Sequence, residues 1–306
     1  MESNSTSSPS VAATARGSSP ADLIRLMRPA EWIKNSLVFG PLIFSKHLFD
    51  LHALALVTLA FFCFCVIASG AYVMNDLQDC ERDRQHPLKR LRPLPAGRIS
   101  RPTAVALAAV LMIGGIGAAA VLGTGFLTLT ALYLGLQFAY TYWLKEIVIL
   151  DVMAIAAGFV IRAAAGGVVI DVPISPWLII CTFLLMLFLG FSKRRHELTL
   201  LEENATHHRA SLREYSPYFL DQMISVVTAS TVVAYAIYTV SPEVREKLGT
   251  ELLYLTIPFV LFGIFRYLYL VHQREQGGNP SRVLLSDRPL LADILLWFLT
   301  VAVLLY

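Results

Sequence analysis

Four oxygen-bearing side chains close together in the sequence have the clearest potential for chemistry: Asn75, Asp76, Asp79 and Asp83. At about 100° per residue, an α-helix places all four on one face, within an arc of about 100°. Three carboxylates on one stripe repel each other unless a cation lies among them, and a set of oxygen ligands favours Mg²⁺. Because Mg²⁺ keeps open positions that suit phosphate oxygens, the spacing predicts a metal site for a diphosphate. The alternative is a solvated acidic helix end.

Two charged residues lie inside an apolar segment of the sequence, where charged residues are rare. Asp151 and Arg162 fall inside one apolar run, about 16 Å apart along a helix. An ionised group inside a membrane needs a partner or a water-filled cavity. We therefore expect Asp151 to bind a hydroxyl group or orient a cation such as Lys145. Arg162 is either a phosphate ligand in a deep cavity or a structural bridge to backbone carbonyls.

The composition indicates a membrane protein. Of the 306 residues, 56% are apolar and 15% are charged, against about 25% charged in soluble domains. Together with a mean hydropathy of +0.61, this argues against a soluble enzyme, a disordered chain and a nucleic-acid binder. The four cysteines are too few and too scattered for a disulfide framework or a zinc site, so we interpret them as small apolar residues.

The hydropathy pattern predicts an all-α integral membrane fold with nine transmembrane helices, since each needs roughly 20 apolar residues. Gly123-Thr124-Gly125 and Asp171-Val172-Pro173 mark two of the breaks between helices. The first span is the least apolar at its start. The expected spans are 30–46, 52–74, 103–122, 126–144, 147–170, 174–191, 219–240, 250–271 and 289–306.

The basic residues predict the orientation of these spans. With the N-terminus and the even-numbered loops on one side, that side holds 20 of the 25 lysines and arginines, and the opposite side holds three. Cytoplasmic loops are the ones enriched in Lys and Arg. We therefore expect a plasma-membrane protein with a cytoplasmic N-terminus and an outer C-terminus. Residues 1–20 are predicted to be a disordered cytoplasmic tail, and 21–306 the transmembrane domain.

Two segments resemble the UbiA superfamily of intramembrane prenyltransferases. The N-D-x-x-D-x-x-x-D pattern from Asn75 to Asp83 resembles the family's first aspartate motif, and residues 89–99 resemble its K-R-x-R-P-x-x-x-G-x-I loop. The likeness covers nearly the whole chain after residue 20. It implies a helical bundle around a cytoplasm-facing cavity, in which Mg²⁺ on the first motif binds a diphosphate.

The chain departs from most prenyltransferases where a second D-x-x-x-D motif would follow the sixth helix. It has Ser192-Lys193-Arg194-Arg195-His196-Glu197-Leu198 there, so cations largely replace the acids. We expect Lys193 and Arg194 to bind a phosphate group. Arg195 is as well explained as a positive-inside anchor.

One branch of the superfamily shares this departure and the Arg28-Pro29-x-x-Trp32-x-Lys34-Asn35 segment, namely the decaprenyl-phosphate phosphoribosyltransferases. The resemblance implies transfer of 5-phosphoribose from phosphoribosyl diphosphate (PRPP) to a polyprenyl phosphate, a step toward the arabinose donor of cell-wall arabinan. It implies an enzyme with Asp76, Asp79 and Asp83 as catalytic residues. The expected substrate-binding residues are Lys34, Asn35, Lys89, Arg98, Tyr142, Lys145, Asp151, Arg162, Lys193 and Arg194.

Two other functions are weighed against this one. An aromatic prenyltransferase of the same superfamily would use the same Mg²⁺ motif with a prenyl diphosphate, and the missing second aspartate motif argues against it. A nine-span transporter or a metal-binding membrane protein without enzyme activity would show broken helices or paired repeats near the middle of the bilayer, and neither is visible in the sequence. The expected partners are the two substrates and the lipid bilayer, and no nucleic acid is expected. A homo-oligomer is compatible with the sequence, and docking of a separate phosphatase is left open.

Overall fold

The computed structural model describes residues 19–306 except 86–88, 203–211, 213, 275–276 and 279, and it leaves out the side chains of 200–202. The expected disordered tail therefore lies almost wholly outside the described residues. All regular elements in the described part are helices. In chain order they are α1 Pro20–Met27, η1 Pro29–Phe39, α2 Gly40–Phe44, α3 Leu51–Gln85, η2 Lys89–Leu91, α4 Arg101–Val121, α5 Thr124–Tyr142, η3 Leu144–Glu146, α6 Leu150–Val169, α7 Pro176–Glu202, α9 Pro217–Val240, α10 Pro242–Leu248, η4 Leu252–Thr256, α11 Ile257–Gln273, α12 Pro280–Ser286 and α13 Arg288–Leu305.

Local sequence explains where several of the helices begin and end. Proline stands in the first turn of α4, α9 and α13, where its missing N–H costs no hydrogen bond. The side chains of Ser100, Ser216 and Asp287 accept hydrogen bonds from the first-turn backbone of these same helices. The two breaks expected from Gly123-Thr124-Gly125 and Asp171-Val172-Pro173 are confirmed, because α5 begins at Thr124 and α7 at Pro176.

Seven described helices are long and apolar enough to cross a membrane: α3, α4, α6, α7, α9, α11 with η4, and α13. Large apolar side chains on their outer surfaces are exposed, among them Val110, Ile113 and Val303. Such a surface fits contact with lipid rather than water. The chain is accordingly a multi-pass membrane protein.

The structure differs from nine uniform spans at two places. The expected span 30–46 is not one α-helix, because η1 and the short α2 divide it at Gly40. The expected span 126–144 is the continuous helix α5, whose threonines, tyrosines and Gln137 lower its hydropathy.

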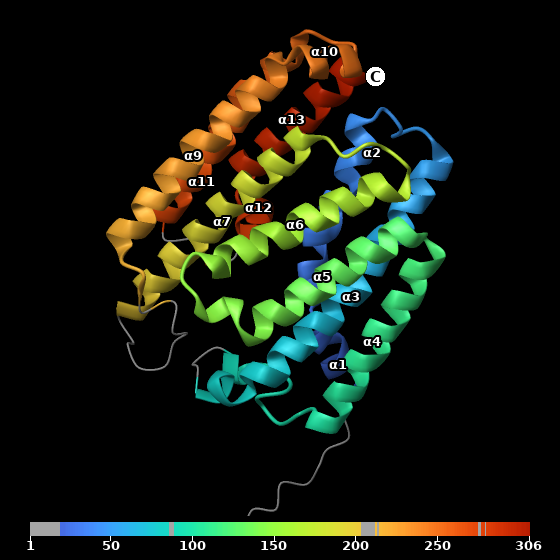
Figure 1. Cartoon of the computed structure of the whole chain (residues 1–306). Helices are drawn as coiled ribbons and strands as arrows, with labels where there is room; N and C mark the ends of the chain where they lie inside the picture. Colours follow the sequence, from blue (N-terminus) through green and yellow to red (C-terminus); the bar gives the residue numbers. More distant parts are fainter. Residues whose placement is uncertain (1–18, 86–88, 203–211, 213, 275–276, 279) are drawn as a thin grey trace, which may run out of the picture.

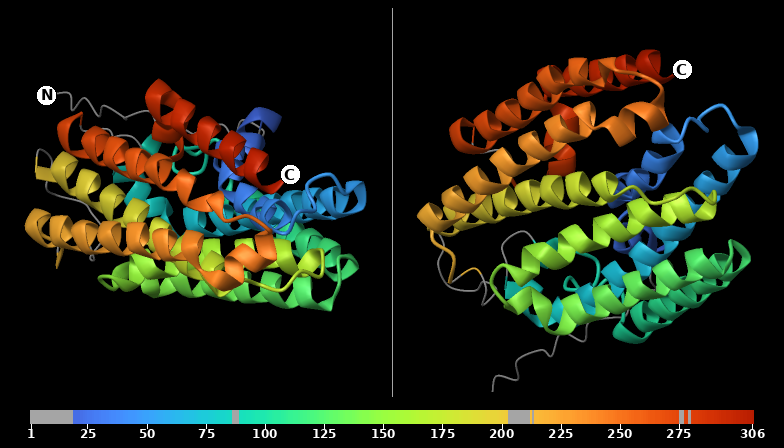
Figure 2. Two further views of the ribbon diagram at one scale, coloured as in Figure 1. Left: turned by 90° about the horizontal axis from the view of Figure 1, so that it is seen from above. Right: turned by 45° about the horizontal axis from the view of Figure 1, so that its top comes forward.

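The helices form two packed groups that meet at α6 and α7. In Figure 1, α3, α4 and α5 lie to one side of α6, and α9, α11 and α13 lie beyond α7 on the other. One apolar core joins η1, α3, α5 and α6, and a second joins α7, α9, α11 and α13. Figure 2 shows the same order of helices from two further directions.

The two longest helices carry charge at the same end of the bundle. Helix α3 has 35 residues, about 52 Å, which exceeds the roughly 30 Å of a bilayer core. Its apolar part ends near Met74, and α7 likewise turns polar at Ser192. The C-terminal ends of α3 and α7, which we call the charged end of the bundle, lie together at the bottom of Figure 1, opposite the chain's C-terminus.

Segment η1 crosses α6 at very short range. A Cβ on Gly166 would lie 1.9 Å from the carbonyl oxygen of Val38, so only glycine allows this approach. This contact places Asn35, one turn earlier in η1, inside the bundle beside α3.

Candidate active site

The predicted carboxylate stripe lies at the charged end of α3, and basic side chains from elsewhere in the chain hold two of its members. Asp76 is buried, with 1% of its surface exposed, and it pairs with the guanidinium of Arg28. Arg92 Nη1 lies 3.1 Å from Asp76 Oδ1 and 2.6 Å from Asp83 Oδ2. A single guanidinium therefore bridges Asp76 and Asp83, which shows that they share one face of the helix.

The third carboxylate has its own cation. Lys145, in η3, is 3% exposed and lies with its Nζ 2.7 Å from Asp79 Oδ1. The amide of Asn75 donates to Asp79 Oδ2 at 3.2 Å. The structure thus brings Asn75, Asp79 and Lys145 together, and the predicted site residue Lys145 joins the stripe.

The repulsion expected along the stripe is relieved by Arg28, Arg92 and Lys145. The arginines nearest in sequence pair with glutamates, Arg82 with Glu146 at 2.7 Å and Arg84 with Glu81 at 2.9 Å. Arg28 and Arg92 were not among the residues predicted for the site. Both stand in the R-P-x-x-W-x-K-N and K-R-x-R-P segments, which was the available signal.

The donor set of the stripe fits Mg²⁺ in its chemistry. All four side chains offer oxygen, and the buried Asn75 Oδ1 accepts no hydrogen bond from any residue that the structure describes. Within the described residues, however, no three carboxylate, histidine or cysteine side chains are close enough to enclose one ion. The carboxylates are instead each engaged by a basic side chain, so a metal would have to displace those cations.

Arg28 occupies a strained backbone conformation between α1 and η1. Its φ of 54° and ψ of 60° lie in the left-handed region that non-glycine residues rarely adopt. Its guanidinium lies 5.3 Å from the ring centre of Tyr72 while it pairs with Asp76. Strain of this kind persists where surrounding contacts impose it, often at functional sites.

A second polar network joins α6 and α7 just inside the charged end. Arg194 Nε lies 2.8 Å from Asp151 Oδ2, and Arg194 Nη1 lies 2.6 Å from Glu197 Oε2. The Tyr215 hydroxyl donates to Asp151 Oδ1 at 2.8 Å and accepts from the backbone N–H of Ile149 at 2.7 Å. Asp151 is thus the partner of a cation, one of the roles expected for it. Burial, with the Asp151 carboxylate beside it, raises the pKa of Tyr215, so its hydroxyl stays protonated.

Two lysines lie nearer to the surface of the site. Lys34 pairs with Glu31 one turn earlier in η1. Lys193 lies 3.6 Å from Glu197 and keeps 40% of its side chain exposed. Of the two cations expected to bind a phosphate at this place, Arg194 is therefore buried in a structural network, and Lys193 is accessible to a ligand.

A deeper group of polar side chains lies where α5, α6 and η1 meet α3. Arg162 donates to the Tyr133 hydroxyl at 2.7 Å, and its guanidinium lies 4.8 and 4.7 Å from the ring centres of Tyr133 and Phe159. Asn35 donates to Cys65 Sγ at 3.3 Å, and its Oδ1 is buried without a partner.

Three expected site residues have other surroundings. Arg98 pairs with Asp22 at 3.0 Å and donates to the Leu91 carbonyl, so it ties the loop after α3 to α1. Tyr142 is exposed and packs on Phe138 and Trp143. Lys89 is half-buried at the start of η2.

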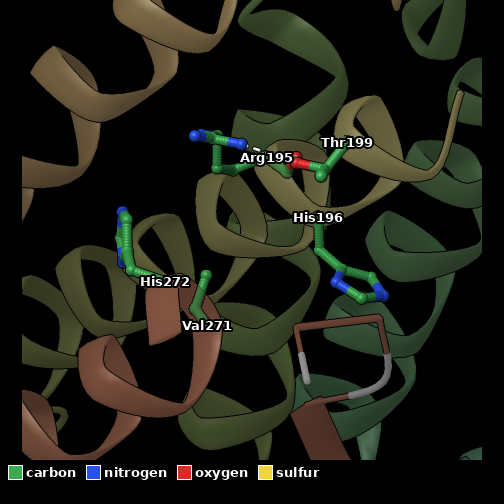
Figure 3. A pocket seen from close by; sticks show the side chains of 5 residues that line it. All are labelled: Arg195, His196, Thr199, Val271 and His272. Atoms are coloured by element: carbon green, nitrogen blue, oxygen red, sulfur yellow. Dashed lines mark hydrogen bonds between the residues drawn. The ribbon is translucent and has the colours of Figure 1, made fainter. Parts of the chain in front are cut away.

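Two cavities lie outside these groups. One of about 90 Å³ is lined by Arg195, His196, Thr199, Val271 and His272, as Figure 3 shows. Its Arg195 pairs with Asp221 at 3.0 Å, which supports a structural role for this arginine. The other, of about 220 Å³, is an apolar cleft between α5, α6 and α7. Its lining residues are Leu136, Leu144, Leu150, Met153, Ala154, Ala157 and Phe183.

Comparison with known proteins agrees with the fold and the motifs. The chain is 33% identical over 293 residues to a decaprenyl-phosphate phosphoribosyltransferase of Mycolicibacterium smegmatis, covering 93% of this chain and 92% of that protein. It is 31% identical over 289 residues to the protein of that name from Corynebacterium glutamicum, covering 93% and 86%. A UbiA homologue from Archaeoglobus fulgidus, solved with GPP and Mg²⁺, superposes with a TM-score of 0.68 at 17% identity, covering 92% and 99% of the two chains.

A family match gives the same result. Residues 36–291, which include the carboxylate stripe, Lys145, Arg162 and the Arg194 network, match the UbiA prenyltransferase family. The two relatives from M. smegmatis and C. glutamicum, which the chain covers to 92% and 86% of their length, are named decaprenyl-phosphate phosphoribosyltransferases. The chain therefore belongs to the UbiA prenyltransferase family.

Proposed function

We propose that this membrane transferase moves 5-phosphoribose from PRPP to a polyprenyl phosphate such as decaprenyl phosphate and releases diphosphate. In this proposal the product serves synthesis of the arabinose donor for cell-wall arabinan, including arabinogalactan. The names of the relatives from M. smegmatis and C. glutamicum support the reaction.

The observation that carries the proposal is the balance of charge at the site. The acidic stripe on α3 pairs with three cations from separate segments, Arg28, Arg92 and Lys145. Two more cations, Lys34 and Lys193, interact with Glu31 of η1, on which Arg28 also acts. PRPP carries a diphosphate and a 5-phosphate, and the acceptor carries a further phosphate. One acidic motif with many cations suits three phosphate-bearing groups better than two acidic motifs would.

The proposed metal ligands are Asn75, Asp76, Asp79 and Asp83. Bound there, Mg²⁺ would neutralise the charge that develops on the departing diphosphate. Arg28, Arg92 and Lys145 now neutralise the same carboxylates. Once these three side chains are released from the carboxylates, they can donate hydrogen bonds to phosphate oxygens of the donor. Substrate binding would thus replace the ion pairs within the protein with ion pairs to the substrate.

The chain's own part in the reaction is placement and electrostatic stabilisation. The C1–O bond of the donor loosens toward an oxocarbenium-like ribose. The acceptor phosphate is already ionised at pH 7, so no general base is needed, and attack from the face opposite the diphosphate inverts C1 from α to β. Lys34, Lys89 and Lys193 are proposed to orient the phosphate groups.

The proposal includes a membrane topology. Counting η1 with α2 and α5 as crossings gives nine passes, with the charged end and the N-terminus in the cytoplasm and the C-terminus outside. The excess of Lys and Arg in the loops at the charged end supports this orientation. PRPP, which is water-soluble, would then reach the site from the cytoplasm.

A transfer assay tests the proposal. Purified protein in detergent is supplied with ribose-labelled PRPP, decaprenyl phosphate and Mg²⁺, with EDTA in a parallel sample. We expect label in the lipid phase only when Mg²⁺ is present. Absence of transfer, with consumption of a prenyl diphosphate by an aromatic acceptor instead, would assign the chain to the aromatic prenyltransferases of the family.

A further inference from the structure

Arg162 differs from the paired cations of the site, because no carboxylate in the described part of the chain forms an ion pair with it. Of the described basic residues nearby, six contact a carboxylate, whereas Arg162 contacts only the hydroxyl and ring of Tyr133 and the ring of Phe159. It is 4% exposed, and its buried Nε has no hydrogen-bond partner among the residues that the structure describes. The six paired cations are Arg28, Lys34, Arg92, Lys145, Lys193 and Arg194.

An unpaired guanidinium in the interior of a membrane protein is costly. Removal of the charge from water is strongly unfavourable, and contact with the faces of two aromatic rings offsets only part of that penalty. A structural arginine would be expected to carry a carboxylate, as Arg194 does with Asp151. Arg162 is therefore suited to an anion that arrives with a ligand.

Arg162 lies on the deep side of the carboxylate stripe. Tyr72, one helical turn inside Asp76 on α3, interacts electrostatically with both Arg162 and Arg28. Cys65, deeper still on α3 and hydrogen-bonded by Asn35, also interacts with Arg162. The order along α3 from the charged end inward is thus Asp83, Asp76, Tyr72 and then the level of Arg162.

This order fits one of the two substrates. In the proposed function the diphosphate is held at the stripe and departs toward the charged end. An in-line displacement brings the nucleophile from the opposite side, which here is the deeper side. The acceptor is anchored in the bilayer by its isoprenoid tail, so its phosphate can reach that side from between the helices.

We propose that Arg162 binds the phosphate of the membrane-embedded acceptor, a polyprenyl phosphate monoester, and aims it at C1 of the donor. The inference rests on the proposed function and deepens it. It assigns the acceptor phosphate to a subsite at Arg162, separate from the donor subsite at the carboxylate stripe. The Nε–H of Arg162 has no hydrogen-bond partner within the described ranges, and a phosphate oxygen would satisfy it. The Tyr133 hydroxyl holds the guanidinium in place from the side of α5.

The test measures binding without catalysis. Thermal unfolding of the purified protein in detergent is followed with decaprenyl phosphate, with decaprenol, and with PRPP plus Mg²⁺, each alone. The difference between the lipid phosphate and the alcohol isolates the contribution of the phosphate. For wild type we expect decaprenyl phosphate to stabilise the fold more than decaprenol does.

The informative variant is Arg162→Gln, with Arg266→Gln as its matched control. Arg266 also lies over a tyrosine ring, but it pairs with Asp287 on the far side of the bundle from α3. We expect R162Q to lower the affinity for decaprenyl phosphate at least tenfold, to the level of decaprenol, and to leave PRPP affinity within about twofold. R266Q should retain both affinities.

Two results would overturn the assignment. Unchanged affinity for decaprenyl phosphate in R162Q removes Arg162 from the acceptor subsite, and a selective loss of PRPP affinity places Arg162 in the donor subsite instead. If R162Q does not fold, Arg162→Lys carries the same test, because it keeps the charge but loses the planar fork of donors. Failure of the proposed function is distinguishable, since wild type would then bind the lipid phosphate through Arg162 and still transfer no label from PRPP.

Discussion

The ammonium of Lys145 lies 2.7 Å from a carboxylate oxygen of Asp79, and this pair ties the segment after α5 to the charged end of α3. The two residues are 66 positions apart in the chain. Lys145 is almost wholly buried, so the pair is shielded from water and strongly favours one arrangement of the two segments. A cation held this close to the stripe is also placed to meet a phosphate group once Asp79 takes another partner.

Replacing Lys145 with methionine should impair both the donor site and the fold. The change keeps the apolar stem and removes the charge, so Asp79 loses its counterion. We expect kcat/KM for PRPP to fall by roughly 10- to 100-fold, the equivalent of one lost charge-assisted contact of about 1.5–3 kcal/mol. The measurement is steady-state transfer at saturating lipid. The matched control is Lys247→Met in α10, at the other end of the bundle, which should behave as wild type.

Removing carboxylates from the stripe should abolish transfer without unfolding the protein. Asp76→Asn and Asp79→Asn keep the shape of the side chain and a neutral oxygen, but they lose the charge that binds a cation. We expect each to lower the transfer rate by at least 100-fold at any Mg²⁺ concentration that supports wild type. The control is Asp221→Asn on α9, whose carboxylate pairs with Arg195 outside the stripe. Near-normal rates in both stripe variants would contradict the proposed metal site.

Lys193 and Arg194 are neighbours that should respond to mutation in different ways. Lys193→Gln removes a half-exposed charge, so we expect weaker substrate binding with little change in thermal stability. Arg194→Gln leaves Asp151 buried without its cation, and loss of one partner of a buried pair typically costs about 3–5 kcal/mol. Parallel measurements of KM and of the unfolding temperature separate the two effects. A K193Q variant with unchanged KM for both substrates would exclude Lys193 from the site.

The contrast between these two residues shows what the sequence could and could not predict. The helical period was sufficient to predict that Asp76 and Asp83 share one face of α3, where Arg92 joins them, because their spacing is local to one helix. The same local rule placed Lys193 and Arg194 at the end of α7. It could not tell which of the two turns toward Asp151, since that depends on how α6 packs against α7.

The pairing of Arg28 and Arg92 with Asp76 depends on contacts between segments far apart in the chain. Their motifs were visible in the sequence, but a motif does not specify which carboxylate an arginine meets. Tyr215 was not predicted either, because nothing in its own segment indicates that its hydroxyl reaches Asp151. The break of the first expected span at Gly40 follows from packing as well, because η1 lies directly against α6.

Gly166 should be the glycine in α6 that tolerates a methyl group least. An alanine Cβ at this position would overlap the carbonyl oxygen of Val38, so η1 would have to move away from α6. That movement would displace Asn35 and open the interior beside Arg162. We expect Gly166→Ala to lower the thermal stability clearly and to reduce transfer in proportion to the loss of acceptor binding.

The control for this prediction is Gly117→Ala in α4, where a Cβ would meet nothing within 4 Å. In a helix, alanine is favoured over glycine by about 1 kcal/mol, so this variant should be as stable as wild type or slightly more stable. Unfolding temperatures of the two variants, measured in the same detergent, check the comparison directly. Equal stability of G166A and G117A would show that η1 can move off α6 at little cost, and the close packing at Val38 would then not be what positions Asn35.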